Sequence, residues 1–230
     1  ITFATQGDTV NFGALSSNRD STGALANSSR AVFGAGEGSS TYMDVMDYYT
    51  ISSTGSATDF GDLTVARQNP SGLASPTRGC FNMGQTSSAH VNTIDYITIG
   101  STGNATDFGD ATVAMRNSGA CSSDTRGIIF GGADPQSTDT IQYFTIASTG
   151  NASDFGNLTQ AANGCAGTSS NTRGLRGGGE NTGAIGSAFS RTDTIDYITI
   201  ASTGNATDFG DLTNTRTEVI GLSNAHGGVQ

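Results

Sequence analysis

A chain of 230 residues with 33 glycines, three prolines and only 13% charged residues favours a single all-β domain built from many short strands. The net charge is −10 and all ten basic residues are arginines, which excludes the basic face that a nucleic-acid partner requires. Lysine and glutamate are scarce, which argues against a helical repeat, and no apolar run approaches the ~18 residues of a membrane span. We therefore expect one domain over residues 1–230, without membrane insertion.

The first predicted element, in chain order, is half of a repeat. Residues 1–15 contain two short stretches on either side of Gly7-Asp8, which predicts two strands joined by a tight turn. A small and polar stretch follows, with an inner strand expected near residues 23–28. Residues 30–36 then begin a motif of the form Arg-Gly-apolar-Phe-Gly-Gly, which returns at 78–84, 126–132, 173–179 and, in part, 226–230.

A second motif recurs after each of these segments. Residues 95–110, Asp-Tyr-Ile-Thr-Ile-Gly-Ser-Thr-Gly-Asn-Ala-Thr-Asp-Phe-Gly-Asp, have close copies at 47–62, 142–157 and 196–211 and a clipped copy at the start of the chain. Its phenylalanines are Phe12, Phe60, Phe108, Phe155 and Phe209, spaced by 48, 48, 47 and 54 residues. A fixed period in this range is typical of a solenoid or a propeller. Each module contains four predicted strands, the content of one propeller blade.

Two features suit the blades of a propeller. Glycine, alanine and serine dominate the first strand of each module, where blades converge and backbones approach closely. The recurrent phenylalanine is expected to fill the wedge between neighbouring blades farther from the axis.

The third module resembles a kelch repeat. It has a double glycine after an apolar strand, at Gly131-Gly132, then Tyr143, Gly150 and Phe155 with a following leucine. The resemblance covers nearly the whole chain but departs from kelch repeats in carrying phenylalanine where they usually have tryptophan. The repeated Tyr-Ile-Thr-Ile-Ala-Ser-Thr-Gly-Asn-Ala-Thr-Asp-Phe-Gly-Asp unit is also similar to repeats in tail-fibre and other virion proteins of marine bacteriophages.

Counting the modules predicts a five-bladed β-propeller of four-stranded antiparallel blades. Four blades lie at about residues 16–64, 65–112, 113–159 and 160–213, and the fifth combines residues 1–15 with 217–230, so that strands from both ends of the chain seal the ring. The alternative is that the sequence is a piece of a longer array.

Strand alternation predicts two unlike faces. One carries the nearly identical Thr-Gly-Asn-Ala turns, and the other carries irregular loops at residues 37–44, 85–92, 133–139 and 180–193. Loops on a rigid scaffold can vary without disturbing the core, so we expect ligand binding on the irregular face. The candidate binding residues there are Tyr42, His90, Gln136, Phe189 and Arg191.

A ring of basic residues opens the second strand of every module. Arg30, Arg78, Arg126 and Arg173, with His226 in the fifth position, could face an anionic ligand near the axis. Alternatively, each arginine pairs with a nearby acid such as Asp47, Asp95 or Asp196 and fixes the register of the blades.

Other motifs carry weaker hypotheses. The acid pairs Asp59/Asp62, Asp107/Asp110 and Asp208/Asp211 have ligands suited to calcium, but the first and third copies lack a full pair, and acids that bind local backbone N–H groups explain the pattern more simply. Asn-x-Ser/Thr sites such as Asn104 are expected from hairpin geometry alone. Cys80, Cys121 and Cys165 occupy different repeat positions, which favours buried thiols over disulfides.

Catalysis finds little support in the sequence. The only histidines are His90 and His226, too few for a typical zinc or copper cluster, and galactose oxidase, which shares the kelch-type fold, has copper ligands that cannot be assigned here. A sialidase-like arrangement would rely on the arginine ring. We expect no enzyme, no cofactor and no metal.

The resemblance to phage repeats implies a virion-surface or tail-fibre module that contacts a host glycan or protein, or other virion proteins. A secreted lectin with one weak sugar site per blade is the alternative, because several weak sites gain by avidity. A purely architectural decoration protein is the third hypothesis.

Overall fold

The computed structural model describes residue 8 and residues 10–182 and 190–222. These residues form strands and no helix, so none of their segments qualifies as a membrane-spanning helix. The prediction of an all-β chain is confirmed.

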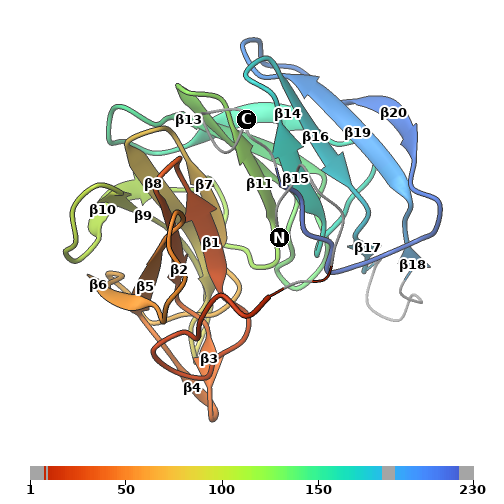
Figure 1. The fold of residues 1–230 in the computed structure, drawn as a ribbon. Helices are drawn as coiled ribbons and strands as arrows, with labels where there is room; N and C mark the ends of the chain where they lie inside the picture. Colours follow the sequence, from red (N-terminus) through yellow and green to blue (C-terminus); the bar gives the residue numbers. More distant parts are fainter. Residues whose placement is uncertain (1–7, 9, 183–189, 223–230) are drawn as a thin grey trace.

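Sixteen of the strands form four antiparallel sheets, each built from consecutive parts of the chain (Figure 1). The first sheet contains β1 (Gly23–Ala26), β2 (Arg30–Gly34), β5 (Val45–Thr50) and β6 (Thr58–Asp62); the second contains β7 (Ser71–Ala74), β8 (Arg78–Gln85), β9 (His90–Thr98) and β10 (Thr106–Asp110); the third contains β11 (Gly119–Ser122), β12 (Arg126–Phe130), β13 (Thr140–Thr145) and β14 (Ser153–Asn157); and the fourth contains β15 (Ala166–Ser169), β16 (Arg173–Gly177), β19 (Thr194–Thr199) and β20 (Thr207–Asp211). Two hairpins, β3 (Glu37–Gly38) with β4 (Thr41–Tyr42) and β17 (Glu180–Asn181) with β18 (Ser190–Arg191), project between second and third strands of the first and fourth sheets.

The first strands of the four sheets, β1, β7, β11 and β15, lie side by side in the middle of the molecule (Figure 1). Their small residues are required by close approach: a Cβ at Gly72 would collide with the carbonyl of Ala24, and one at Gly167 with the carbonyl of Ala120. The expected small-residue inner strands are therefore present, and glycine is needed where two inner strands meet.

The core lies in wedges between neighbouring sheets. Phe60 of β6 belongs to one buried cluster with Ile97 and Ile99 of the second sheet. Phe108 and Phe155 take the same place in the next two wedges. Phe209, the equivalent residue of the fourth sheet, is 52% exposed because no described sheet follows it. The predicted wedge role of the phenylalanines is confirmed for the three inner junctions.

The Asp-Phe-Gly segments dock each sheet on the next. Asp107 Oδ1 accepts a hydrogen bond from the Gly109 N–H at 3.0 Å, where a bulge shifts the register between β9 and β10. Gly109 has φ +139°, and a Cβ there would lie 2.6 Å from the carbonyl of Gly150 in the next sheet. The Asp110 N–H then donates to Asn151 Oδ1 of the same turn at 3.0 Å. The first acid of this motif thus bonds a local backbone N–H, as the simpler sequence interpretation predicted, whereas the asparagine bonds the backbone of the preceding sheet.

The two ends of the described chain repeat these contacts. The Phe12 and Ala14 carbonyls accept bonds from the Gly55 and Ala57 N–H groups, just as Phe60 and Asp62 do from the second sheet's turn. At the other end, residues 220–222 lie along β15, and the Leu222 carbonyl accepts a bond from Thr168 Oγ1 at 2.7 Å.

The described part of the predicted fifth blade contains no strand. Residues 10–15 form none, and the residues predicted to pair with them, at 1–5, lie outside the described part of the chain. The strand predicted at 226–230 lies outside it as well. The described sheets form an open arc around the inner strands and no closed ring.

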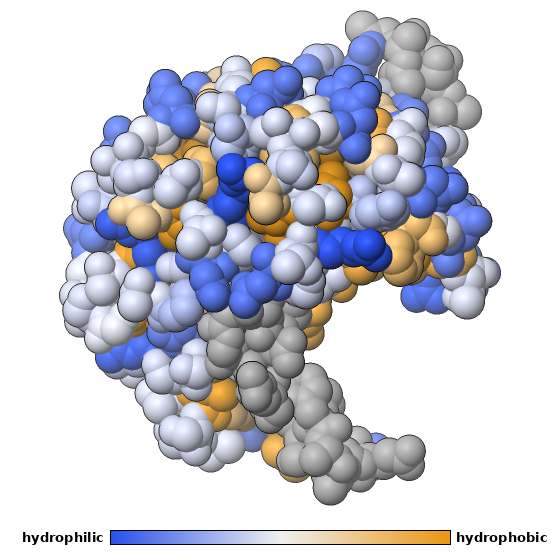
Figure 2. Space-filling view, turned by 90° about the horizontal axis from the view of Figure 1, so that it is seen from above, coloured by the Kyte–Doolittle hydropathy of each residue, from blue (hydrophilic) through white to orange (hydrophobic). Residues whose placement is uncertain are grey.

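The arc has two faces, on which the connections between strands lie, and the two differ in surface. The β3–β4 and β17–β18 hairpins lie at the lower end of the molecule in Figure 1. We call this face the loop face, and it comprises residues 35–44, 85–90, 131–139, 178–182 and 190–193. The opposite end, which we call the turn face, carries the turns between third and fourth strands. Seen from above in Figure 2, that end is mostly hydrophilic, and hydrophobic side chains show mainly in recesses.

Candidate binding surface on the loop face

Each loop of the loop face begins with the same backbone kink. Two successive residues with positive φ follow β2, β12 and β16 and lie near the end of β8: Ala35-Gly36, Gly131-Gly132, Gly178-Gly179 and Met83-Gly84. The second of the two is always glycine, because a Cβ at Gly84 would lie 2.6 Å from the Gln68 carbonyl and one at Gly179 2.8 Å from the Asn163 carbonyl. The two positive-φ residues therefore turn the chain out of the strand direction at the base of each loop.

A pair of mutual backbone hydrogen bonds fixes the base of each loop. They join Asp20 to Glu37, Gln68 to Gln85, Arg116 to Ala133 and Asn163 to Glu180. Each pair connects the residue three positions before a first strand with the residue that follows the two positive-φ residues. The loops consequently start from a rigid base.

Side chains at these base positions link each loop to the loop of the preceding sheet. Gln68 Nε2 donates to Tyr42 Oη at 3.0 Å, and Arg116 Nη1 donates to Gln85 Oε1 at 3.1 Å. Asn163 Nδ2 donates to Ser137 Oγ at 2.8 Å. One such bond spans every junction between described sheets, so the four loops form one connected surface.

Two further contacts strengthen this surface. His90 Nδ1 lies 2.7 Å from Asp134 Oδ1, which joins the loops of the second and third sheets. Ser137 N donates to Thr182 Oγ1 at 2.8 Å, which joins the third to the fourth.

The structure places the predicted loop residues in two groups. Tyr42 and His90 are half-buried and bound to neighbouring loops, whereas Gln136 and Arg191 are exposed. Phe189 lies outside the described residues. Sequence reasoning missed Gln68, Gln85, Arg116 and Asn163 as a group, although their constant distance from the recurrent Arg-Gly motif was a usable signal.

The arginine ring is not where the sequence suggested. Arg30, Arg78, Arg126 and Arg173 each lie over a tyrosine ring of the third strand, with 4.3–4.5 Å from guanidinium carbon to ring centroid. Three of them also donate to a carbonyl of the next sheet, as Arg126 Nη1 does to Ile200 at 2.7 Å. These guanidinium groups point toward the third strand and the next sheet, because the tyrosine and the carbonyl hold them there. His226 lies outside the described residues.

The predicted pairing of these arginines with Asp47, Asp95 and Asp196 is wrong. Those three acids are buried and pair with other arginines: Arg19–Asp47 at 2.9 Å, Arg67–Asp95 at 2.9 Å and Arg176–Asp196 at 2.6 Å. All four arginines of the ring lie over a tyrosine of their own sheet, and three of them bond the next sheet through a backbone carbonyl.

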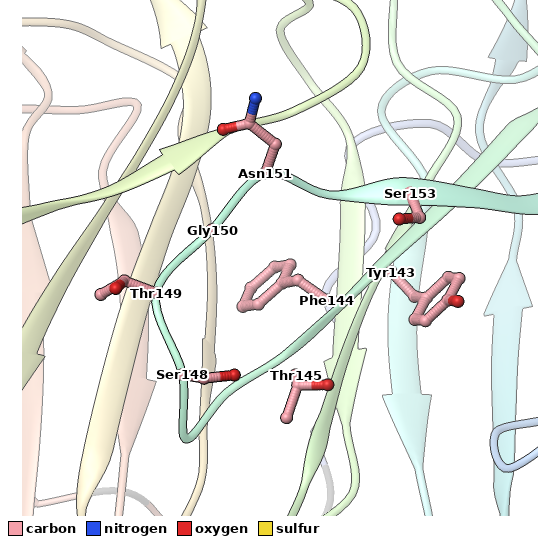
Figure 3. Close-up of a pocket in the computed structure, with 8 residues that line it drawn as sticks. All are labelled: Tyr143, Phe144, Thr145, Ser148, Thr149, Gly150, Asn151 and Ser153. Atoms are coloured by element: carbon pink, nitrogen blue, oxygen red, sulfur yellow. The ribbon is translucent and has the colours of Figure 1, made fainter.

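A small concavity of about 250 Å³ lies at the β13–β14 turn on the turn face. Figure 3 shows Phe144 on the side of the turn at Ser148–Asn151, and Tyr143 pointing the opposite way. Hydroxyl and amide groups line it, from Thr145, Ser148, Thr149, Asn151 and Ser153. The same residue types recur at the corresponding turns of the second and fourth sheets.

A second cavity of about 390 Å³ lies between the inner strands. Its walls are mostly apolar and small, from β1, β7, β11 and β15, with Ile220 and Leu222 at one side. It offers few polar groups for a specific ligand.

The cysteines are buried, unpaired thiols in separate positions, as predicted. Burial raises the pKa of Cys80 and Cys121 to about 12. Within the described ranges, no three histidine, cysteine or acidic side chains come together as metal ligands.

A comparison with protein-family models finds no match for this chain, and a comparison with curated proteins finds no significant similarity.

Proposed function

We propose that this chain is a five-bladed β-propeller, closed by residues 1–15 and 217–230, and that it serves as a non-enzymatic binding module on the surface of a virion. In this proposal it belongs to a tail-fibre or similar structure, and its loop face contacts a glycan or a protein on the host cell. The resemblance of its repeated sequence to repeats of phage virion proteins supports the proposed location on a virion.

The connected loop face carries the proposal of a binding role. Loops of different length and sequence are joined across every described junction by side-chain bonds, such as that from Gln68 to Tyr42. A rigid surface of this kind loses little conformational entropy when it binds. Its half-exposed tyrosine, amides and guanidinium are groups that bind sugars or peptides well.

A screen of the purified protein on a glycan array, followed by titration of the hits, tests the binding role. Replacing the exposed loop-face residue Gln136 with alanine, together with Tyr42→Phe, is expected to weaken binding at least tenfold. The matched change on the turn face, Ser148→Ala with Thr149→Ala, is expected to leave binding unchanged. Binding that survives the loop-face changes would contradict the proposal.

The second candidate function is a secreted lectin with one weak site per sheet. The hydroxyl-lined concavity at Tyr143–Ser153 favours it, since its residue types recur at other turns. The same experiment separates the two: a lectin of this kind loses affinity with the turn-face changes and binds several equivalents of sugar per chain. A chain that binds no glycan and no host-cell protein would favour the purely architectural role.

A further inference from the structure

Arg116 differs from its counterparts on the loop face because it brings a positive charge. The equivalent positions hold Asp20, Gln68 and Asn163. Arg116 is half-buried, its Nη1 donates to the neutral amide of Gln85, and its buried Nε has no hydrogen-bond partner in the described part of the chain.

No carboxylate of the described residues pairs with this guanidinium. The nearest acid along the bridged loop, Asp134, instead contacts His90 at 2.7 Å. Arg19, Arg67 and Arg176 pair with buried acids, whereas the half-buried Arg30, Arg78 and Arg126 are each held by a tyrosine ring and a backbone carbonyl. In a chain with a net charge of −10, a fixed arginine without an acid is suited to an external anion.

The neighbours of Arg116 are uncharged and keep hydrogen-bonding capacity. Gln85 uses its Oε1 toward Arg116, which leaves its NH₂ group free to donate. Gln68 donates to Tyr42 Oη, which leaves the Gln68 carbonyl as an acceptor and the Tyr42 hydroxyl as a donor. Tyr42, Gln68, Gln85 and Arg116 thus form a hydrogen-bonded row, in which the backbones of Gln68 and Gln85 also pair. Two amides, a phenol and one guanidinium match a ring that bears several hydroxyls and one carboxylate.

We propose that Arg116, Gln85, Gln68 and Tyr42 form a subsite for an acidic sugar, with the sugar carboxylate on Arg116 and its hydroxyls on the two amides and the tyrosine. This assignment rests on the proposed binding role of the loop face and specifies its ligand class. An acidic peptide fits less well, because it lacks the hydroxyls and the negative chain would repel several carboxylates together.

Ligand-observed NMR titration with matched probes tests the subsite. The probes are sialyllactose against lactose, and galacturonate against its methyl ester. The unmodified chain is expected to bind each acid at least tenfold more tightly than its neutral counterpart. Arg116→Gln should abolish this preference, and Arg116→Lys should restore it only in part, because a lysine cannot bind a carboxylate in two parallel bonds.

Gln85→Glu provides a test that keeps the arginine in place. The new carboxylate would pair with Arg116 inside the protein, so the preference for acidic sugars should disappear while thermal stability is kept. Arg216→Gln makes the same charge change as Arg116→Gln at an exposed residue and should not alter binding.

The outcomes separate this inference from the proposed function. An acid preference that persists in Arg116→Gln or Gln85→Glu overturns the subsite, and so does the absence of any preference in the unmodified chain while neutral sugars still bind the loop face. If no glycan or host-cell protein binds the loop face at all, the proposed function itself fails.

Discussion

Buried charge in the described part of this chain is held at one structural position, which the four sheets fill in three different ways. In the first two sheets the arginine comes from the segment before the first strand, as in Arg67–Asp95. In the fourth sheet Arg176 reaches the same acid position from β16, where the second sheet has Phe81. The third sheet has Met115 and Gln142 at the two positions and no charge at all.

The neutral pair of the third sheet predicts what happens when Arg67 and Asp95 of the second sheet are replaced by methionine and glutamine. Both Arg67 and Asp95 have side chains with no exposed surface, and burial lowers the pKa of Arg67 while Asp95 opposes that shift. Arg67→Met alone leaves a buried carboxylate unpaired and should reduce the free energy of unfolding by about 3–5 kcal/mol. Adding Asp95→Gln should recover most of that loss.

Urea unfolding of the single and double variants measures the coupling. Losses that simply add would show that the pair does not act as a unit. The double variant is not expected to exceed the unmodified chain, since the Gln142 amide of the natural neutral pair has a nitrogen without a partner.

The buried thiols make the free energy of unfolding depend on pH in the alkaline range. Burial raises the pKa of Cys80 and of Cys121 from 9.0 to about 12. The unfolded chain loses these protons first, so the stability they contribute is present below pH 9 and is lost as the pH rises toward 12. The expected slope is about 1.4 kcal/mol per pH unit per thiol. Unfolding measured between pH 8 and 11 should show a smaller loss in Cys80→Ala, and an unchanged slope would contradict this origin.

At the scale of the element, the Asp-Phe-Gly strand works through its backbone. Gly109 is held at φ +139° against the Gly150 turn of the next sheet, and the Asp107 carboxylate caps the bulge. The positive φ of Gly109 and the close carbonyl of Gly150 both exclude a side chain at residue 109.

Gly109→Ala should therefore separate the second and third sheets and reduce the free energy of unfolding by about 2–4 kcal/mol. Gly100→Ala is the matched control: the space around Gly100 is open, and Ala147 and Ala201 occupy its position in other copies. That variant should be neutral or slightly stabilising. Equal losses in the two variants, measured by urea unfolding, would show that backbone docking is not the cause.

The strands could be predicted well from the sequence, but the side-chain contacts between segments could not. The period, the four strands per module, the glycine-rich inner strands and the wedge phenylalanines all follow from local pattern, and the structure has them. The partner of Asp95 did not follow, because Arg67 approaches from another segment and Arg78, nearer in the motif, is drawn to Tyr96. The roles of Gln68 and Arg116 did not follow for a similar reason: both residues precede a first strand and lie outside the loops that their side chains contact.

At the scale of the whole molecule, both ends of the described chain repeat the contacts that join one described sheet to the next. Gly13 meets the Gly55 turn as Gly109 meets Gly150, and a Cβ at Gly221 would collide with the Gly167 carbonyl as one at Gly72 would with Ala24. On the free side of the fourth sheet, Phe209 is exposed and Gly210 has open space around it. These are the groups that a fifth blade would cover.

Gly210 therefore provides a test of ring closure in solution. It has φ +136°, close to that of Gly109, but no atom of the described residues lies within 4 Å of an added Cβ. If residues 1–15 close the ring, the Gln6-Gly7 turn lies against Gly210 as the Gly150 turn does against Gly109, and Gly210→Ala should cost about as much as Gly109→Ala. If the edge of the fourth sheet is free, only backbone strain remains, and Gly210→Ala should cost about 1 kcal/mol. Urea unfolding of the two variants side by side distinguishes these values, and the smaller cost would rule out the closed ring.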